Sequence, residues 1–135
     1  PAYEQQARTL AAKEGVQGRL DWRLHDLAQD PGGVAPADLV VLHRVVCCYP
    51  YYERLLGAAA DHARRALVFS YPPRNPLSRA FYGLFNLVMR LTRSGFRGFA
   101  HPPGAMLAVL EDRGLRRTVQ RRSRIWQVAG LKRVS

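Results

Sequence analysis

Side chains with chemical potential gather at one point of this sequence, directly after an apolar run. The segment DLVVLHRVVCCYPYYERLL follows the run DLVVL with His43, Arg44, Cys47, Cys48 and Tyr49. An apolar run of this kind is typical of a strand that is buried on both faces of a parallel sheet. Doubly wound sheets bind their ligands at the carboxyl ends of such strands. The segment is therefore either a site for chemistry or an ordinary strand end.

The two cysteines are adjacent, and this spacing limits what they can do. Cys47 and Cys48 are the only cysteines of the chain. Two neighbouring thiols build no disulfide framework and supply too few ligands for a structural zinc site. Reduced, half-buried thiols that act as packing residues are the simpler interpretation. The sequence shows no cluster of metal ligands, so we expect no metal site.

Size and composition indicate one globular domain over residues 1–135. The chain has a mass of 15.2 kDa, and 47% of its residues are hydrophobic. A chain of this length can bury a real core. No apolar run approaches the roughly 18 residues that span a membrane, and the start PAYEQQARTL lacks the layout of a signal peptide. We therefore expect a cytoplasmic protein without a membrane span.

The chain is strongly basic, which raises the question of an anionic partner. Its formal net charge is +11 and its pI is about 10.8. Clustered Lys and Arg favour nucleic acid by releasing counterions from phosphates. Here the arginines are spread along the chain, and the densest run, RGLRRTVQRRSR, has no interleaved aromatic residues, although Trp126 follows it. A solvated basic face or an anionic small molecule is therefore favoured over nucleic acid.

Hydrophobic periodicity and turn residues predict an alternation of strands and helices. Strands are predicted over residues 19–25, 38–45, 65–71, 115–121 and 125–133. Helices are predicted over residues 3–13, 51–63 and 77–91, the last capped by Asn75 or Ser78, and from the prolines at 102–103 to Gly114. The last two strands follow each other so closely that they must pair antiparallel. The predicted fold is α/β, a doubly wound, mostly parallel sheet with a C-terminal antiparallel hairpin.

The order of these elements resembles the class I S-adenosylmethionine-dependent methyltransferases. The resemblance is carried by YEQQARTLAAKEGVQGRLDWRLHDL, ADLVVLHRVVCCYP, RALVFSYPP, FAHPPGAMLAVLEDRGL and IWQVAGLKR, and it spans nearly the whole chain. Within the class, the sequence is most similar to small-molecule enzymes of the type that includes the magnesium-protoporphyrin methyltransferases. The resemblance implies S-adenosyl-L-methionine as the cofactor and a small-molecule methyl acceptor as the partner.

The same resemblance implies that the chain holds the C-terminal two-thirds of a methyltransferase domain. Its first helix matches the helix after the family's second strand. The glycine-rich cofactor loop and the acidic residue that binds the ribose would then lie before Pro1, and the missing initiator Met agrees with this. The predicted strand over residues 19–25 would lose its neighbour, leaving an orphaned edge. We expect this piece alone to bind the cofactor weakly or not at all.

Four residues match positions that hold the cofactor in the resembling family. Asp26 corresponds to the acidic residue that accepts a hydrogen bond from the adenine amino group, and the Leu27 amide lies beside the adenine ring. A carboxylate can accept from an exocyclic amine, and a backbone amide can donate to a ring nitrogen. His43 and Arg44 correspond to the lining of the methionine arm. The alternatives are a turn or cap role for Asp26, and a His43 that closes its strand by bonding to backbone.

Catalytic residues follow by position, with one departure. Tyr49 lies on the loop that borders the transferred methyl group in the family. The similar porphyrin enzymes have a His near the position of Cys48. A thiol with a reference pKa of about 8.5 is mostly neutral at pH 7, so the sequence does not identify the general base. His101, ahead of two prolines and a helix start, is the other candidate base. In-line methyl transfer can also run largely on positioning.

The substrate side is expected around residues 75–92, where such enzymes often insert a cap helix over the substrate. Tyr71 ends the strand over residues 65–71 and Arg74 follows it, and Tyr82 and Phe85 are candidates for an apolar pocket under the cap. An aromatic stripe at helical spacing also suits packing against the sheet, which is the alternative.

Two functional hypotheses follow from the sequence. The first is S-adenosylmethionine-dependent methyl transfer to a small, hydrophobic or aromatic acceptor. The second is a non-catalytic, methyltransferase-like module for binding or dimerisation, with a basic face for an anionic partner. Either form could assemble as a homo-oligomer. A glycine-rich loop after a strand upstream of Pro1 would favour the first.

Overall fold

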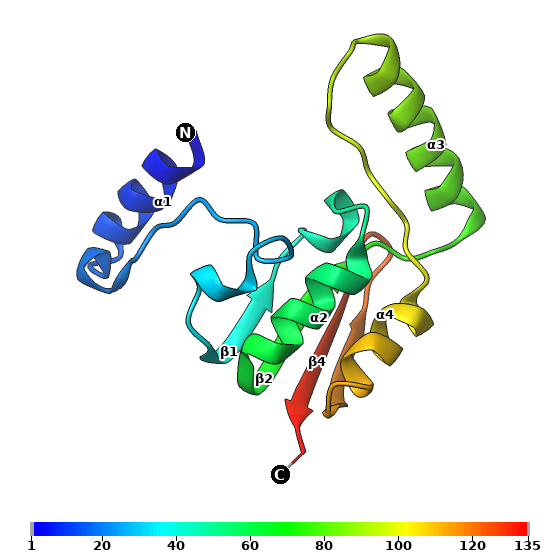
Figure 1. Ribbon diagram of the computed structural model, residues 1–135. Helices are drawn as coiled ribbons and strands as arrows, with labels where there is room; N and C mark the ends of the chain where they lie inside the picture. The colour runs from blue at the N-terminus through cyan, green and yellow to red at the C-terminus, as the bar shows by residue number, and fades with distance from the viewer. Residues whose placement is uncertain (1, 135) are drawn as a thin grey trace.

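Four strands form one mixed sheet in this computed structural model, which describes residues 2–134 (Figure 1). The strands are β1 (Ala37–Leu42), β2 (Ala63–Tyr71), β3 (Leu115–Arg122) and β4 (Gln127–Arg133), in the order β1-β2-β4-β3. β1 and β2 are parallel, and β4 is antiparallel to both of its neighbours. β1, β2 and β3 thus point the same way. The α/β fold with a C-terminal antiparallel hairpin is confirmed.

Helices cover one face of this sheet. The helices are α1 (Ala2–Lys13), α2 (Tyr52–His62), α3 (Pro76–Leu91) and α4 (Pro103–Glu111), with 3-10 turns η1 (Gln17–Arg19), η2 (Pro31–Gly33) and η3 (Val46–Cys48). α2 and α4 pack against each other and against the sheet, whereas α1 lies to one side of it (Figure 1). All four predicted helices are present. None of the described helices is long and apolar enough to cross a membrane.

The core lies between the sheet and the pair α2 and α4. Leu67 and Phe69 alternate along β2 toward this layer, where Leu56 of α2 and Leu110 of α4 meet them, and all four are fully buried. Burial of each such side chain contributes roughly 1.5–3 kcal/mol. The core therefore fixes how β2 lies beneath the helices, and with it the strand ends.

The opposite face of the sheet stays open over the described residues. Leu39 and Val41 of β1 are 53% and 58% exposed, and Val119 of β3 is 52% exposed. Val41, Val68, Gly130 and Val119 follow one another across the strands, so these side chains share that face. The apolar sequence of β1 is that of a strand buried on both faces, but here only one face is covered.

The predicted strand over residues 19–25 is wrong. η1 occupies Gln17–Arg19, and residues 20–26 carry no strand, with the Leu24 side chain 84% exposed. A strand needs the hydrogen-bond ladder of a neighbour, and within residues 2–134 no strand lies along the free edge of β1. The apolar alternation is therefore not sufficient to form a strand here.

α3 projects away from the sheet and begins at a reciprocal cap (Figure 1). The Asn75 side chain accepts from the Ser78 amide at 2.7 Å, and the Ser78 hydroxyl accepts from the Asn75 amide at 3.0 Å. The two predicted capping residues thus act together. Asn86 pairs with the backbone of Gly98 on the returning segment in both directions, at 2.8 and 2.9 Å. No residue of α3 is fully buried, so the alternative of core packing against the sheet does not apply.

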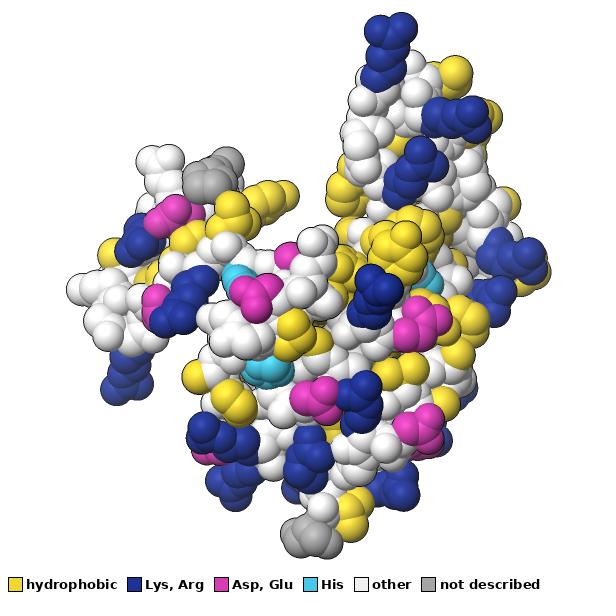
Figure 2. Space-filling model, viewed as in Figure 1, with side chains coloured by type: hydrophobic (Ala, Val, Ile, Leu, Met, Phe, Trp, Pro, Cys, Tyr) yellow, Lys and Arg dark blue, Asp and Glu magenta, His cyan; other side chains and the backbone are white. Residues whose placement is uncertain are grey.

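The basic side chains do not form a single stripe on the face of the molecule shown in Figure 2. Lys and Arg are scattered over this face, from α1 to the projecting α3. This distribution agrees with the spread of arginines along the sequence.

Candidate functional site

The bend that follows β1 contains a strained residue that is held by a buried hydroxyl. Arg44 has a φ of 57°, in the left-handed region that few non-glycine residues adopt. Its amide donates to Ser70 Oγ of β2 at 2.8 Å, and the Ser70 side chain is buried. The Ser70 oxygen also lies 3.3 Å from His43 Nδ1. A serine hydroxyl donates one hydrogen bond and can accept two, so Ser70 can hold both the Arg44 amide and the His43 ring in either tautomer of the imidazole.

The exposed ring of His43 is thus held through Nδ1 at the carboxyl edge of the sheet, and its Nε2 has no hydrogen-bond partner among residues 2–134. Its Nδ1 bonds to a side chain of the next strand, not to the backbone, so the alternative of a strand-closing backbone bond is not what this geometry shows.

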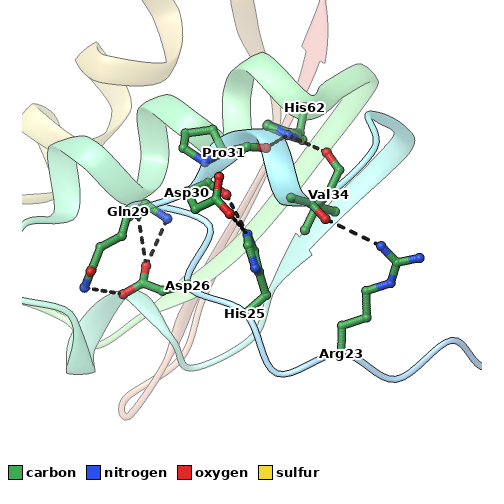
Figure 3. Close-up of polar contacts among 10 residues, drawn as sticks. Arg23, His25, Asp26, Gln29, Asp30, Pro31, Val34 and His62 are labelled. Atoms are coloured by element: carbon green, nitrogen blue, oxygen red, sulfur yellow. Dashed lines mark hydrogen bonds and ion pairs between the residues drawn. The ribbon is translucent and has the colours of Figure 1, made fainter.

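Asp26 organises the turn before η2 (Figure 3). Its Oδ1 accepts from the amides of Ala28 at 3.0 Å and Gln29 at 3.3 Å, and its Oδ2 accepts from Gln29 Nε2 at 2.9 Å. The Tyr49 hydroxyl reaches both carboxylate oxygens at 3.2 Å. The turn role that the sequence left open is thus real. The same carboxylate also joins the loop over residues 20–36 to the loop after β1.

The Tyr49 hydroxyl acts as a donor in this arrangement. Burial raises its pKa above the ordinary value, and the hydrogen bond to the Asp26 carboxylate raises it further. Tyr49 therefore keeps its proton at neutral pH. It can orient Asp26 or donate to a ligand, but it cannot serve as a base there.

His101 is brought to the same loop by the segment that returns from α3. Its Nε2 lies 2.9 Å from the Tyr49 carbonyl, and because a carbonyl only accepts, this nitrogen carries a proton. The ring stacks on Phe99 at 5.4 Å and meets Tyr52 at 4.6 Å between centroids. Burial lowers the pKa of His101, although the bond to Tyr49 opposes this shift. His101 is therefore neutral at pH 7.

The two cysteines are free thiols of different exposure. Cys47 is buried and Cys48 is exposed, with their sulfur atoms 3.7 Å apart. The Cys47 thiol donates to the Arg44 carbonyl at 3.5 Å, and burial raises its pKa to about 12. Cys47 is thus an inert packing residue. Among residues 2–134 no group of His, Cys, Asp and Glu side chains could hold a metal ion.

The expected substrate residues separate into two groups. Tyr71 is 1% exposed and stacks on Phe69 at 5.1 Å, so it lies in the core and supports the end of β2. Arg74 is exposed in the turn before α3. Tyr82 and Phe85 are partly buried on the side of α3 that faces the returning segment, close to Gly98.

Sequence reasoning missed two residues at this edge. Ser70 holds both His43 and the backbone of Arg44, and a polar residue inside an apolar strand was its only signal. Trp126, at the tip of the β3–β4 hairpin, lies under the Arg44 guanidinium at 4.8 Å from its ring centroid. An aromatic residue in a basic turn was the corresponding signal there.

Comparison with known proteins identifies the fold. No protein-family model and no curated protein matches this chain. Among solved structures, an O-methyltransferase family protein from Burkholderia thailandensis matches with a TM-score of 0.78 and 22% identity, over 100% of this chain and 42% of that one.

Two further matches carry bound molecules. Magnesium protoporphyrin IX methyltransferase from Synechocystis PCC 6803 with bound SAH matches at a TM-score of 0.64 and 20% identity, over 91% of this chain and 58% of that one. An O-methyltransferase family 2 protein from Planctomyces limnophilus in complex with apigenin matches with a TM-score of 0.73 and 21% identity, over 99% of this chain and 41% of that one. The chain has a partial methyltransferase fold and spans 41 to 58% of the length of these three proteins.

Proposed function

We propose that this chain is part of an S-adenosylmethionine-dependent methyltransferase that acts on a small molecule. The observation that carries the proposal is the hydrogen-bonded group of Asp26, Tyr49 and His101 at the carboxyl edge of a partial methyltransferase fold. Ligands of doubly wound sheets bind at this edge. The bound SAH of the Synechocystis enzyme supports the choice of cofactor.

The polar groups at this edge suit the two arms of S-adenosyl-L-methionine. The Asp26 carboxylate can accept from an adenine amine in place of the exposed Gln29 side chain, which is its most easily displaced partner. The Leu27 amide has no hydrogen-bond partner among residues 2–134 and can donate to a ring nitrogen. The Arg44 guanidinium, and the His43 ring in the tautomer that is protonated on Nε2, can donate hydrogen bonds to the methionine carboxylate.

The chemistry is a single in-line displacement. When bound, the cofactor supplies a methyl group on a sulfonium, and an oxygen, nitrogen or carbon atom of the acceptor attacks it. The chain's own residues orient the two reactants, and positioning of this kind can supply much of the rate. His101 is neutral at pH 7 and can therefore take a proton from the acceptor, while the protonated Tyr49 holds Asp26 in place. Of the residues expected on the substrate side, Tyr82 is the proposed acceptor contact.

Calorimetry with S-adenosylhomocysteine tests the proposal on the longest native form of the protein. We expect saturable binding that the substitution Asp26→Asn weakens by about tenfold, since a charge-assisted hydrogen bond is lost. Asp38→Asn is the matched control, because Asp38 is exposed on β1 toward its amino end, away from the carboxyl edge. The 135-residue chain alone should bind weakly or not at all. No heat of binding with the longer protein would leave the non-catalytic module as the function.

A further inference from the structure

A groove separate from the Asp26 cluster opens between the start of α3 and the tip of the β3–β4 hairpin. Its volume is about 470 Å³, within the range of small-molecule sites. Its walls are mainly apolar and aromatic, and they include Pro72, Pro73, Phe81, Tyr82 and Trp126. The groove thus offers flat surfaces to a ligand of modest size.

The aromatic walls come from two elements, α3 and the hairpin tip. The rings of Phe81 and Tyr82 lie 5.5 Å apart at 78°, and the Phe81 side chain is 61% exposed. The backbone of Trp126 is held at the hairpin tip, where the Ser123 hydroxyl accepts from the Trp126 amide at 2.9 Å and donates to its carbonyl at 2.7 Å. Aromatic side chains have only two rotatable bonds, so they bind a planar ligand with little loss of conformational freedom.

The electrostatics of the groove select for negative charge. Arg124 lines the groove, and Arg44 covers the Trp126 ring. Neither guanidinium has an ion-pair partner among residues 2–134. Residues 62–110 and 113–135, which build both walls, contain no Asp or Glu. An anionic group placed here would meet Arg124 without competition from a protein carboxylate.

Trp126 connects this groove to the proposed cofactor edge. The side chain lines the groove and also contacts Arg44, which directly follows His43 at the end of β1. A ligand in the groove would therefore lie beside the residues proposed for the methionine arm.

We propose that this groove binds the methyl acceptor, and that the acceptor is a flat, apolar ring system bearing an anionic substituent. The identification as acceptor rests on the proposed function, whereas the ligand chemistry rests on the groove alone. The ring packs among Phe81, Tyr82 and Trp126, and the anionic group pairs with Arg124.

Paired probes of equal size test the ligand class on the full chain. 2-Naphthoate and 2-naphthamide share one ring system and differ in charge, so calorimetric titration of both isolates the electrostatic contribution. We expect saturable binding of naphthoate that is about tenfold tighter than that of naphthamide, as one charge-assisted contact allows. Equal affinities for the two probes would overturn the proposal.

Three variants locate the site. Arg124→Gln should reduce the affinity for naphthoate to that for naphthamide, whereas Arg121→Gln, an exposed arginine of the same hairpin outside the groove, should leave it unchanged. Trp126→Leu should weaken both probes by about tenfold, and circular dichroism verifies its fold. Equal losses for Arg124→Gln and Arg121→Gln would contradict a specific site.

Titration with S-adenosylhomocysteine on the longest native form separates this inference from the proposed function. Selective naphthoate binding without binding of S-adenosylhomocysteine would keep the anionic-ring site and remove its role as the acceptor site. Binding of S-adenosylhomocysteine without selectivity for naphthoate would overturn the ligand class and leave methyl transfer standing.

Discussion

Asp26 is the residue at which local turn geometry and a long-range contact meet. Its carboxylate caps its own turn through Ala28 and Gln29 and receives the hydroxyl of Tyr49 from the loop after β1. A carboxylate that accepts several hydrogen bonds fixes the segments that donate them. The loop over residues 20–36 has no strand partner, so this contact helps to define its position against the sheet.

Removing the Tyr49 hydroxyl should loosen this junction. Tyr49→Phe deletes the donor to Asp26 while keeping the ring, and we expect a loss of about 1–3 kcal/mol in the free energy of unfolding, as for hydrogen bonds to charged groups. Urea denaturation measures it. Tyr51→Phe is the matched control, because Tyr51 is 60% exposed and should change stability by less than about 0.5 kcal/mol. Equal effects of the two substitutions would mean that the junction contributes nothing.

Burial of His101 should make the stability of the chain depend on pH. Its pKa in the folded state is lowered from 6.5, so the unfolded state binds the proton more tightly. The contribution is fully present above pH 6.5 and is lost as pH falls through the lowered pKa of the folded state. The wild type should therefore lose more stability than His101→Gln between pH 7 and pH 5, measured by denaturant unfolding. A pH-independent difference between the two proteins would contradict a buried neutral imidazole.

At the level of elements, the stability of α3 depends more on its own N-terminal cap than on packing against the core. It has no fully buried residue, and its return segment is tied back through Asn86 and Gly98. Helices without tertiary packing are marginal in water, so local interactions matter more here than in α2 or α4. Flexibility of α3 would also alter the groove, whose walls include Phe81 and Tyr82.

Loss of the cap should therefore destabilise α3 without destabilising the other helices. Asn75→Ala removes the acceptor of the Ser78 amide, which typically costs about 1 kcal/mol, or roughly a fivefold change in the opening equilibrium. Amide hydrogen exchange should accelerate by about this factor in α3 and remain unchanged in α2. Ser94→Ala, beyond the end of α3, is the control variant. Faster exchange in both helices would show that α3 is coupled to the core.

On the scale of the whole molecule, the sheet is covered on one face only. Leu67 of β2 lies fully buried beneath α2 and α4, whereas Leu39 of β1 is 53% exposed on the other face. Both residues are leucines in strands, so replacing each one by alanine measures how well its own face of the sheet is covered.

Truncation of the two leucines to alanine should lower the free energy of unfolding by very different amounts. Leu67→Ala should cost about 2–5 kcal/mol, as for other buried leucines, because it leaves a cavity in the core. Leu39→Ala should cost much less, within about 1 kcal/mol, since most of its apolar surface already meets water. Chemical denaturation of this chain measures both. Comparable losses would mean that the face of Leu39 is also covered in solution.

The regular elements with their own local signals could be predicted from the sequence. The helices carried apolar periodicity, Pro at their starts and the Asn75 cap, and the buried strands β1 and β2 were continuous apolar runs. The hairpin followed from the short connection between its strands. Of the site, the residues after β1 could be found in this way, because chemistry at a strand end is visible along the chain.

What the sequence by itself determined is therefore the type and order of the elements and the residues that end β1. Only the tertiary structure decided whether a strand-like pattern forms a strand, since residues 20–26 lack a ladder partner, and which distant groups meet. Ser70 beneath His43, Tyr49 against Asp26, and Trp126 beneath Arg44 are all contacts between segments far apart in the sequence. Periodicity and capping act over a few residues, whereas pairing and site geometry depend on which surfaces the packed chain brings together.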